Sequence, residues 1–487
     1  MDKELKRNIL RGSAATSIGA VTGMVFQFLT VMVLTRYVSK DALGIYVLVI
    51  VIVNMFNLLG GLGVELTMVK FIASKKNEES QDVLFPVLII RTFGSLFFSI
   101  VFMLIGKYIM HLFDDRIYQY FWYILAIFIL ANYRDLFYNL MQGLNLFKQY
   151  SIVNVVSSVF RIFIVVILLQ FGKLDIRMLL IIEILATSQP LIHQLFVIPF
   201  KKYLSVKPTS ATYKRVVNFS IPLYLNNLVV FINGQMNIFI IGAYLNPASV
   251  ANYDVATKVS VALKKIFSSF IIVYFPNLAT LFSSGEKRTA VNLIDKSLGI
   301  FSILIAFLFV FVFLFRNELT LILFSARYAE ISIAFALLIL NFFIRGLGDL
   351  MGYPFVPAGY PSVPTWINAL ASVISIGLSL LFVPIYGYMG VVYALLVMNL
   401  TSTSLFYFYL VKHNINPRLK SFLKPVLLFL AVPVSLLFSG HFSLLLNGLL
   451  FLITLTIGWT ISDDFRSAMK LLFSYIQKYL RRKRLLN

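Results

Sequence analysis

Residues 34–46 read LTRYVSKDALGIY, and residues 241–253 read IGAYLNPASVANY. In both stretches a tyrosine ends an apolar segment, a turn-forming pair follows, and a second tyrosine comes nine residues after the first. A weaker similarity, at similar spacing, relates Asn154, Ser158 and Val159 to Asn368, Ser372 and Val373. Either one alone is compatible with the general similarity of apolar helices, but together they predict a duplicated unit of six helices.

The surrounding sequence is too hydrophobic for a water-soluble protein of this size. Of 487 residues, 60% are hydrophobic and 13% are charged, and the mean hydropathy is +0.88. A membrane-spanning helix needs about 20 mostly apolar residues, and about fourteen such segments can be placed. They begin near Gly12, Ala42, Leu84, Tyr118, Tyr150, Ile176, Arg215, Ser249, Leu293, Leu319, Ser362, Tyr388, Ser421 and His441. Cysteine is absent, which excludes disulfides, thiolate metal sites and cysteine nucleophiles. These features predict an all-α polytopic membrane protein.

The distribution of basic residues predicts how the chain is oriented. If the spans alternate in direction, most of the 42 Lys and Arg residues fall in connections on one side of the membrane. The positive-inside rule then puts both termini in the cytoplasm, for a multi-pass protein of the cytoplasmic membrane. The N-terminal apolar segment is too long for a signal peptide and lacks a clear cleavage site, so we expect it to remain as the first span.

The net charge of +22 does not indicate nucleic acid, because the basic residues are scattered over loops with no soluble domain to gather them. Anionic membrane lipids are the expected partner. From Asp463 onward, an amphipathic stretch ends in RRKR at residues 481–484, which predicts a helix lying in the inner membrane interface.

The repeat predicts three parts: six-helix bundles at residues 1–205 and 206–412, and two additional helices with the basic tail at residues 413–487. Because six is even, the two bundles have the same orientation in the membrane. Parallel repeats of this kind enclose a central site near the midplane and work by rocking one half against the other.

Four stretches carry a resemblance to a known family. They are residues 11–27 (RGSAATSIGAVTGMVFQ), the turn at residues 37–46, residues 61–73 (GLGVELTMVKFIA) and residues 384–390 (PIYGYMG). Together they are similar to the polysaccharide flippases of the multidrug/oligosaccharidyl-lipid/polysaccharide exporter superfamily, over nearly the whole chain. The resemblance implies transport of a polyprenyl-diphosphate-linked oligosaccharide from the inner to the outer leaflet for surface polysaccharide synthesis. It also implies that a polysaccharide polymerase and glycosyltransferases are partners.

Ionisable side chains inside the predicted spans are candidates for function, because burying a charge in lipid costs a few kcal/mol. Fixed cations in a water-poor cavity bind phosphate oxygens strongly. The candidates are Arg91, Arg134, Arg161, Lys258 and Lys264. Arg91 can alternatively reach water at an interface, and Arg134 can pair with its neighbour Asp135. Arg161 and Lys258 lie deeper and are the preferred cavity candidates.

Uncharged polar residues add a second set of candidates. Gln27 lies on the first span beside Gly19 and Gly23, a stripe that fits close helix packing as well as a cavity wall. Amides on the seventh span, where Pro222 permits a bend, are expected to line the cavity because unpaired amides are costly in hydrocarbon. These amides are Asn226, Asn233 and Asn237.

The driving force is expected to come from a coupling ion, H⁺ or Na⁺, since the sequence has no phosphate-binding loop for a nucleotide. Carboxylates that could exchange a proton or hold a cation are Glu65, Asp135, Glu183 and Asp254. Glu65 lies near a cytoplasmic end and is alternatively a solvated group. No cofactor and no metal site are expected, because the four histidines are dispersed along the chain.

Three other functions stay open. A lipid II-type peptidoglycan precursor flippase would also need a cationic lumen. A cation-coupled multidrug exporter of the same superfamily usually carries a carboxylate in its first helix, and this chain has none between Glu4 and Asp41. A membrane-embedded glycan polymerase or ligase is least favoured, because the outer connections are short and Asp114-Asp115 is their only acidic pair. We therefore expect a transporter without catalytic residues.

Overall fold

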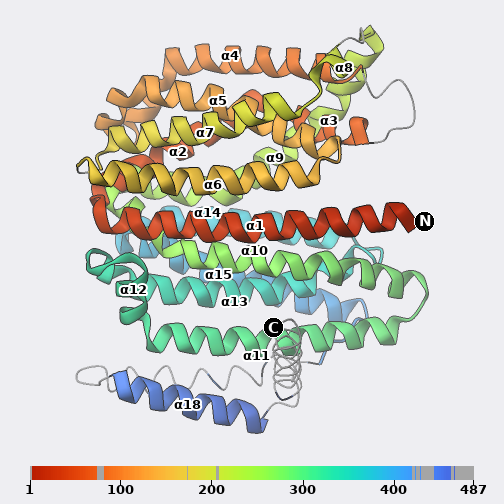
Figure 1. The fold of residues 1–487 in the computed structure, drawn as a ribbon. Helices are drawn as coiled ribbons and strands as arrows, with labels where there is room; N and C mark the ends of the chain where they lie inside the picture. Colours follow the sequence, from red (N-terminus) through yellow and green to blue (C-terminus); the bar gives the residue numbers. More distant parts are fainter. Residues whose placement is uncertain are drawn as a thin grey trace, which may run out of the picture. The chain divides into compact units, whose positions relative to one another are not determined.

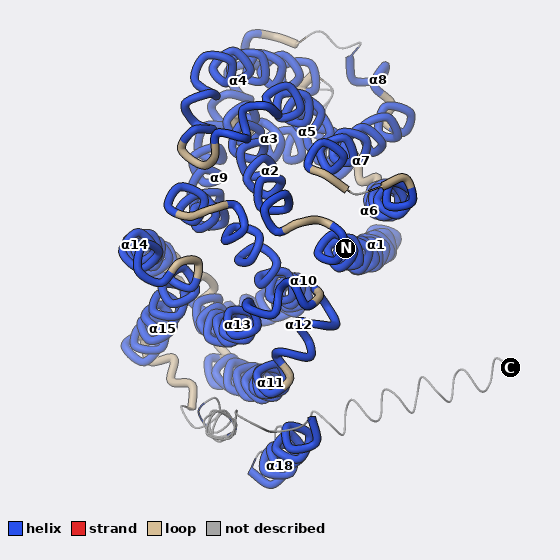
Figure 2. The backbone as a smooth tube through the Cα atoms, turned by 90° about the vertical axis from the view of Figure 1, so that its left-hand side faces the viewer, coloured by secondary structure: helices blue, strands red, loops and turns tan. Residues whose placement is uncertain are grey.

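The computed structural model describes residues 3–73, 82–172, 174–204, 208–418 and 444–461, together with the single positions 423, 428 and 466. These residues form helices and short connections, and they contain no strand (Figures 1 and 2). The predicted all-α class is therefore confirmed. By contact density the chain divides into two compact units, a first unit of Met1–Val255 and a second unit of Ala256–Asn487.

The first unit contains the helices expected from residues 1–205 and also the next long helix. Its elements are α1 (Lys3–Tyr37), α2 (Lys40–Gly61), α3 (Val64–Ala73), α4 (Leu84–His111), η2 (Asp115–Tyr120), α5 (Phe121–Gly143), α6 (Phe147–Gln170), α7 (Ile176–Val197), α8 (Phe200–Leu204) and α9 (Ser210–Tyr244). Helix α10 (Pro247–Ser283) runs from the first unit into the second. The predicted repeat boundaries stay a prediction, because contact density groups helices by packing and does not compare the two halves.

The second unit continues from α10. Its further elements are α11 (Lys287–Leu314), α12 (Arg316–Phe324), η3 (Ala326–Ile331), α13 (Ser332–Gly352), η4 (Tyr353–Phe355), α14 (Ser362–Tyr386), α15 (Met389–Lys412) and α18 (Leu444–Ile461). The predicted tenth span near Leu319 is interrupted, because Ser325 has φ of 98° between α12 and η3. The long helix at this place, α13, therefore begins at Ser332.

Among the described residues, eleven helices are long and apolar enough to cross a membrane, or twelve if the bent α10 counts as one span. Helix α18 lies where the fourteenth span was expected, with an apolar segment of Asn447–Ile457. The expected thirteenth span, residues 421–440, lies almost wholly outside the described residues. The amphipathic tail from Asp463 lies outside them as well, apart from Arg466.

Local sequence explains several helix boundaries in the first unit. The side chains of Ser39, Asp175 and Thr209 each accept a hydrogen bond from a backbone N–H in the first turn of α2, α7 and α9. Helix α2 ends where Leu62 and Gly63 adopt positive φ, of 50° and 72°, so that α3 continues in a new direction.

Small residues determine how α1 packs in the first unit. A Cβ atom on Gly19 would lie 2.8 Å from the Cβ of Ser151 on α6, and one on Gly23 would lie 3.3 Å from the hydroxyl of Ser158. Helices α1 and α6 lie side by side in both views (Figures 1 and 2). The stripe containing Gly19 and Gly23 is thus a packing surface in this structure.

Candidate functional site

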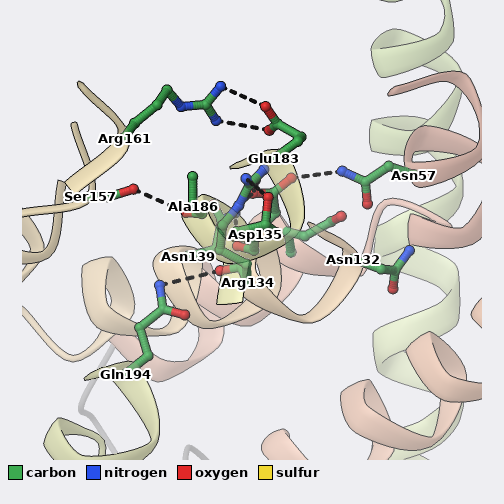
Figure 3. Close-up of polar contacts among 12 residues, drawn as sticks. Asn57, Asn132, Arg134, Asp135, Asn139, Ser157, Arg161, Glu183, Ala186 and Gln194 are labelled. Carbon is green, nitrogen blue, oxygen red and sulfur yellow. Dashed lines mark hydrogen bonds and ion pairs between the residues drawn. The ribbon is translucent and has the colours of Figure 1, made fainter. Parts of the chain in front are cut away.

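A three-residue cluster joins α6, α7 and α2 inside the first unit. The guanidinium of Arg161 donates two hydrogen bonds to the carboxylate of Glu183, of 2.6 and 2.8 Å (Figure 3). The hydroxyl of Tyr46 donates to Glu183 at 2.6 Å and accepts from Arg161 at 3.2 Å. This bidentate geometry is the strongest form of ion pair between these groups. Arg161 is therefore neutralised by a buried partner.

A second pair lies on α5. Arg134 donates from Nε to Oδ1 of its neighbour Asp135 at 2.8 Å, and the other carboxylate oxygen accepts from the amide of Asn57 on α2 at 2.7 Å (Figure 3). The amide of Gln194 donates to the backbone carbonyl of Arg134 at 3.3 Å. The contacts therefore tie α5 to both α2 and α7.

Arg91 on α4 forms the third pair and is completely buried. Its guanidinium binds Glu65 of α3, the side-chain oxygen of Asn57 at 3.1 Å and the backbone carbonyl of Asn132 at 2.8 Å. The alternative in which Arg91 reaches water at an interface is therefore wrong. Glu65 is likewise an ion-pair partner and not merely a solvated group.

The three pairs form a nearly continuous network across the helices α2 to α7. Asn57 links two of them, because it contacts both Arg91 and Asp135. Each of the three cations has a carboxylate partner, so the network as a whole presents no positive surplus. Removing one partner of such a pair leaves an uncompensated buried charge, which is strongly destabilising. This geometry favours a structural role for Arg91, Arg134 and Arg161.

The second unit has a different balance of charge. On α13, Arg345 contacts Asp349 with Nε and Oδ1 2.9 Å apart, and Lys264 of α10 interacts electrostatically with the same carboxylate. The side chain of Lys264 is exposed, and that of Arg345 is 40% exposed. Two cations therefore share one carboxylate and keep access to an incoming anion. Arg345 was not among the candidates from the sequence, although its spacing of four residues from Asp349 on one helix is a local signal for this pair.

The remaining candidates are spread over several helices. Lys258 and Asp254 are half-buried on α10, and Gln27 of α1 and Asn226 of α9 are exposed. Asn237 is buried and hydrogen-bonded to Tyr253. The side chain of Asn233 lies outside the described residues. The described amides thus differ in exposure, and their place in a cavity stays a prediction.

Outside the spans, the acidic pair at residues 114–115 is part of a surface cluster. Arg116 donates to both Asp114 and Asp41, joining the connection after α4 to the start of α2. The hydrogen bonds from Arg116 hold the pKa of Asp114 below its ordinary value. Because these carboxylates already bind Arg116, the cluster is explained by loop structure without a catalytic role.

The apolar helices and the paired charges between them define a polytopic all-α membrane protein. A family model described as "Polysaccharide biosynthesis protein" matches residues 9–282, more than half of the chain. The chain belongs to this family. A search of curated proteins finds no match.

Solved structures share this fold at low sequence identity. The lipid II flippase MurJ in an inward closed conformation has a TM-score of 0.71 and 16% identity, covering 91% of this chain and 98% of that chain. A multidrug resistance MATE family transporter of the MOP superfamily has a TM-score of 0.64 and 13% identity in its inward-facing conformation, covering 81% and 94%. An outward-facing conformation of such a transporter has a TM-score of 0.56 and 15% identity, covering 84% and 96%. Together with the family match, the shared fold confirms the resemblance to this superfamily.

Proposed function

We propose that this protein is a flippase that moves a polyprenyl-diphosphate-linked oligosaccharide repeat unit from the inner to the outer leaflet. The observation that carries the proposal is the match of residues 9–282 to a polysaccharide biosynthesis family in a chain built from membrane-spanning helices. A membrane-embedded member of such a family has a clear task, because a diphosphate with a sugar chain cannot cross hydrocarbon unaided. Alternating access of two bundles would supply the route.

The charge on the second unit supports an anionic cargo. Lys264 and Arg345 share Asp349, which leaves a local positive surplus next to exposed side-chain atoms. A guanidinium and an ammonium group both donate charge-assisted hydrogen bonds to phosphate oxygens. In this proposal they receive the diphosphate while the lipid tail stays in the bilayer. Arg91, Arg134 and Arg161 instead maintain the first unit.

Coupling and partners belong to the same proposal. Glu65, Asp135 and Glu183 each bind an arginine, which favours a structural role. Asp254 on α10 stays the coupling candidate for H⁺ or Na⁺. A cytoplasmic-membrane location with both termini inside, contact with anionic lipids, and cooperation with a polymerase and glycosyltransferases complete the proposal.

The second candidate is a lipid II-type flippase, favoured by the fold similarity to lipid II flippase MurJ. It would use the same diphosphate recognition and differ in the attached sugar. A multidrug exporter is favoured less, because α1 offers no carboxylate between Glu4 and Asp41. Each function is transport, which requires binding and conformational change without a catalytic residue.

Deletion of the protein in its host tests the proposal. Membranes are then analysed for the lipid-linked saccharide that accumulates and for the leaflet in which it lies. We expect an unpolymerised repeat unit on the cytoplasmic side and loss of one surface glycan. Accumulation of a peptidoglycan precursor would establish the second candidate instead. Retention of a drug with unchanged glycans would establish the exporter.

A further inference from the structure

The backbone of α9 packs against the break between α2 and α3, at Leu62 and Gly63. At Gly63, φ is 72°, and a Cβ atom there would lie 2.6 Å from the carbonyl oxygen of Ser220 and 2.8 Å from the backbone nitrogen of Tyr224. These two residues flank Pro222, which interrupts the hydrogen bonding of α9. Only glycine allows both this conformation and this approach. The turn of α9 around Pro222 therefore packs directly against the α2–α3 break, and we call the surface of the break around Gly63 the seat of α9.

Arg91 holds the break from its other side. Its guanidinium binds Asn57 in the last turns of α2 and Glu65 in the first turn of α3. Because Arg91 is completely buried, this arrangement is rigid. The seat for α9 is therefore a preorganised part of the first unit.

Polar and aromatic contacts surround the seat. The ammonium of Lys70 lies 3.6 Å from the ring centroid of Phe219, and the hydroxyls of Thr67 and Ser220 are 2.8 Å apart. Asp82 accepts a hydrogen bond from Thr212, and its carboxylate lies 3.4 Å from Arg215. We call this set the latch: Thr67, Lys70 and Asp82 on one side, and Thr212, Arg215, Phe219 and Ser220 on α9. Figure 1 shows the end of α3 on the same side of the first unit as the N-terminus.

The other end of α9 makes contacts of a different kind. A Cβ atom on Gly242 would lie 2.6 Å from a methyl group of Leu48, and the rings of Phe113 and Phe239 are 5.4 Å apart. Just beyond α9, Gly44 of α2 packs directly against the backbone of Pro247. We call these apolar contacts the pivot. Leu48, Phe113 and Phe239 contribute apolar side-chain atoms to these contacts.

The middle of α9 is much less attached. Leu225, Val229 and Val230 are 58%, 55% and 61% exposed, and no atom lies within 4 Å of the Cβ position at Gly234. Helix α9 is thus fastened to the first unit at two ends. One fastening is polar, with an exposed Lys70 and a half-buried Arg215 beside the buried Thr67–Ser220 pair. The other is apolar and closely packed.

We propose that the latch is a releasable gate of α9, which opens while the pivot stays closed. The proposal rests on the proposed function, since it assigns the inward-opening step of the flippase to this helix. Partly exposed ion pairs and cation–π contacts exchange with water at little net cost. Close-packed glycine contacts do not, because separation leaves voids. In the proposed topology the latch lies at the cytoplasmic end, so its release opens the path by which a lipid-linked headgroup enters.

The absence of cysteine from the chain makes a cross-linking test direct. One double variant carries Thr67→Cys and Ser220→Cys across the latch, where the present hydroxyl distance permits a disulfide. The matched control carries Phe113→Cys and Phe239→Cys across the pivot and is joined with a short bis-thiol reagent. Surface-glycan export is measured in cells before and after cross-linking, and again after reduction.

We expect the latch cross-link to abolish export, reduction to restore it, and the pivot cross-link to leave it unchanged. Full export with a closed latch cross-link, or loss of export from the pivot cross-link, would overturn the proposal.

A second measurement does not depend on the cargo. Adding Lys70→Gln and Asp82→Asn to the latch pair should lower the rate of its disulfide formation about fivefold. The same two substitutions should leave the rate of reagent cross-linking at the pivot pair unchanged. An unchanged rate of disulfide formation at the latch would overturn the gate proposal, even if no export of a glycan is ever detected. If deleting the chain leaves glycan export intact, the proposed function fails while this rate still decides the latch.

Discussion

At the residue scale, the guanidinium of Arg161 meets Glu183 through two hydrogen bonds, and Tyr46 completes the cluster. Glu183 is buried, and a buried carboxylate is satisfied only when its cation is present. The same argument applies to Arg91 with Glu65. Substitutions of these residues are therefore expected to lower the free energy of unfolding rather than the affinity for a cargo.

Replacing Arg161 with Ala should lower the free energy of unfolding by about 3–5 kcal/mol, because Glu183 is then buried without its partner. Thermal unfolding of the detergent-purified protein measures the loss. The double variant Arg161→Leu with Glu183→Leu should recover most of it, since two apolar groups need no partner. The control Lys264→Ala removes an exposed cation and should leave Tm nearly unchanged. An Arg161→Ala protein as stable as the unchanged one would contradict the structural role.

At the element scale, α1 depends on a glycine stripe for its contact with α6. The sequence left this stripe open to two interpretations, a cavity wall or a packing surface. The structure brings Gly19 to Ser151 and Gly23 to Ser158, so helix packing accounts for both glycines. Gln27 further along α1 is exposed, and its role as a cavity residue stays a prediction.

Gly19→Leu should separate α1 from α6 and lower stability by about 1–3 kcal/mol, because the larger side chain has no space against Ser151. The matched control is Gly377→Leu on α14, where no atom lies within 4 Å of the Cβ position. Thermal unfolding should show a lower Tm for the first variant only. Equal Tm values for the two variants would exclude close packing at Gly19.

At the scale of the whole molecule, charge differs between the two units. Arg91, Arg134 and Arg161 of the first unit are matched by carboxylates. In the second unit, Lys264 and Arg345 share a single carboxylate, that of Asp349. Substitutions at the paired arginines of the first unit are thus expected to lower stability, whereas substitutions at Lys264 and Arg345 are expected to lower cargo transport.

The double variant Lys264→Ala with Arg345→Ala should reduce glycan export about tenfold or more, because a hydrogen bond to a charged group contributes about 1.5–3 kcal/mol. Its Tm should stay close to that of the unchanged protein, since both side chains are partly exposed. Lys148→Ala, which removes an exposed lysine from the start of α6, is the control for loss of charge alone. Normal export in the double variant would exclude this pair as a diphosphate site.

The sequence predicted the positions of the helices better than the contacts between them. Apolar segments located the starts of α2, α7 and α9 to within a few residues, because hydrophobic length is a local signal. The interruption at Ser325 was missed, since a positive φ at serine has no reliable sequence signal. The pairing of Arg161 with Glu183 was missed because the two residues lie on different helices, and only helix packing brings them together.

By itself, the sequence determined the class of protein, since hydrophobic length and the placement of basic residues act segment by segment in the membrane. It also identified the ionisable side chains that lie within the apolar segments. Only the tertiary structure decided which of these charges cancel, that α9 packs with the first unit, and that Gly63 admits its backbone. The physical reason is distance: burial and pairing depend on groups far apart in the chain, which meet only when the helices pack.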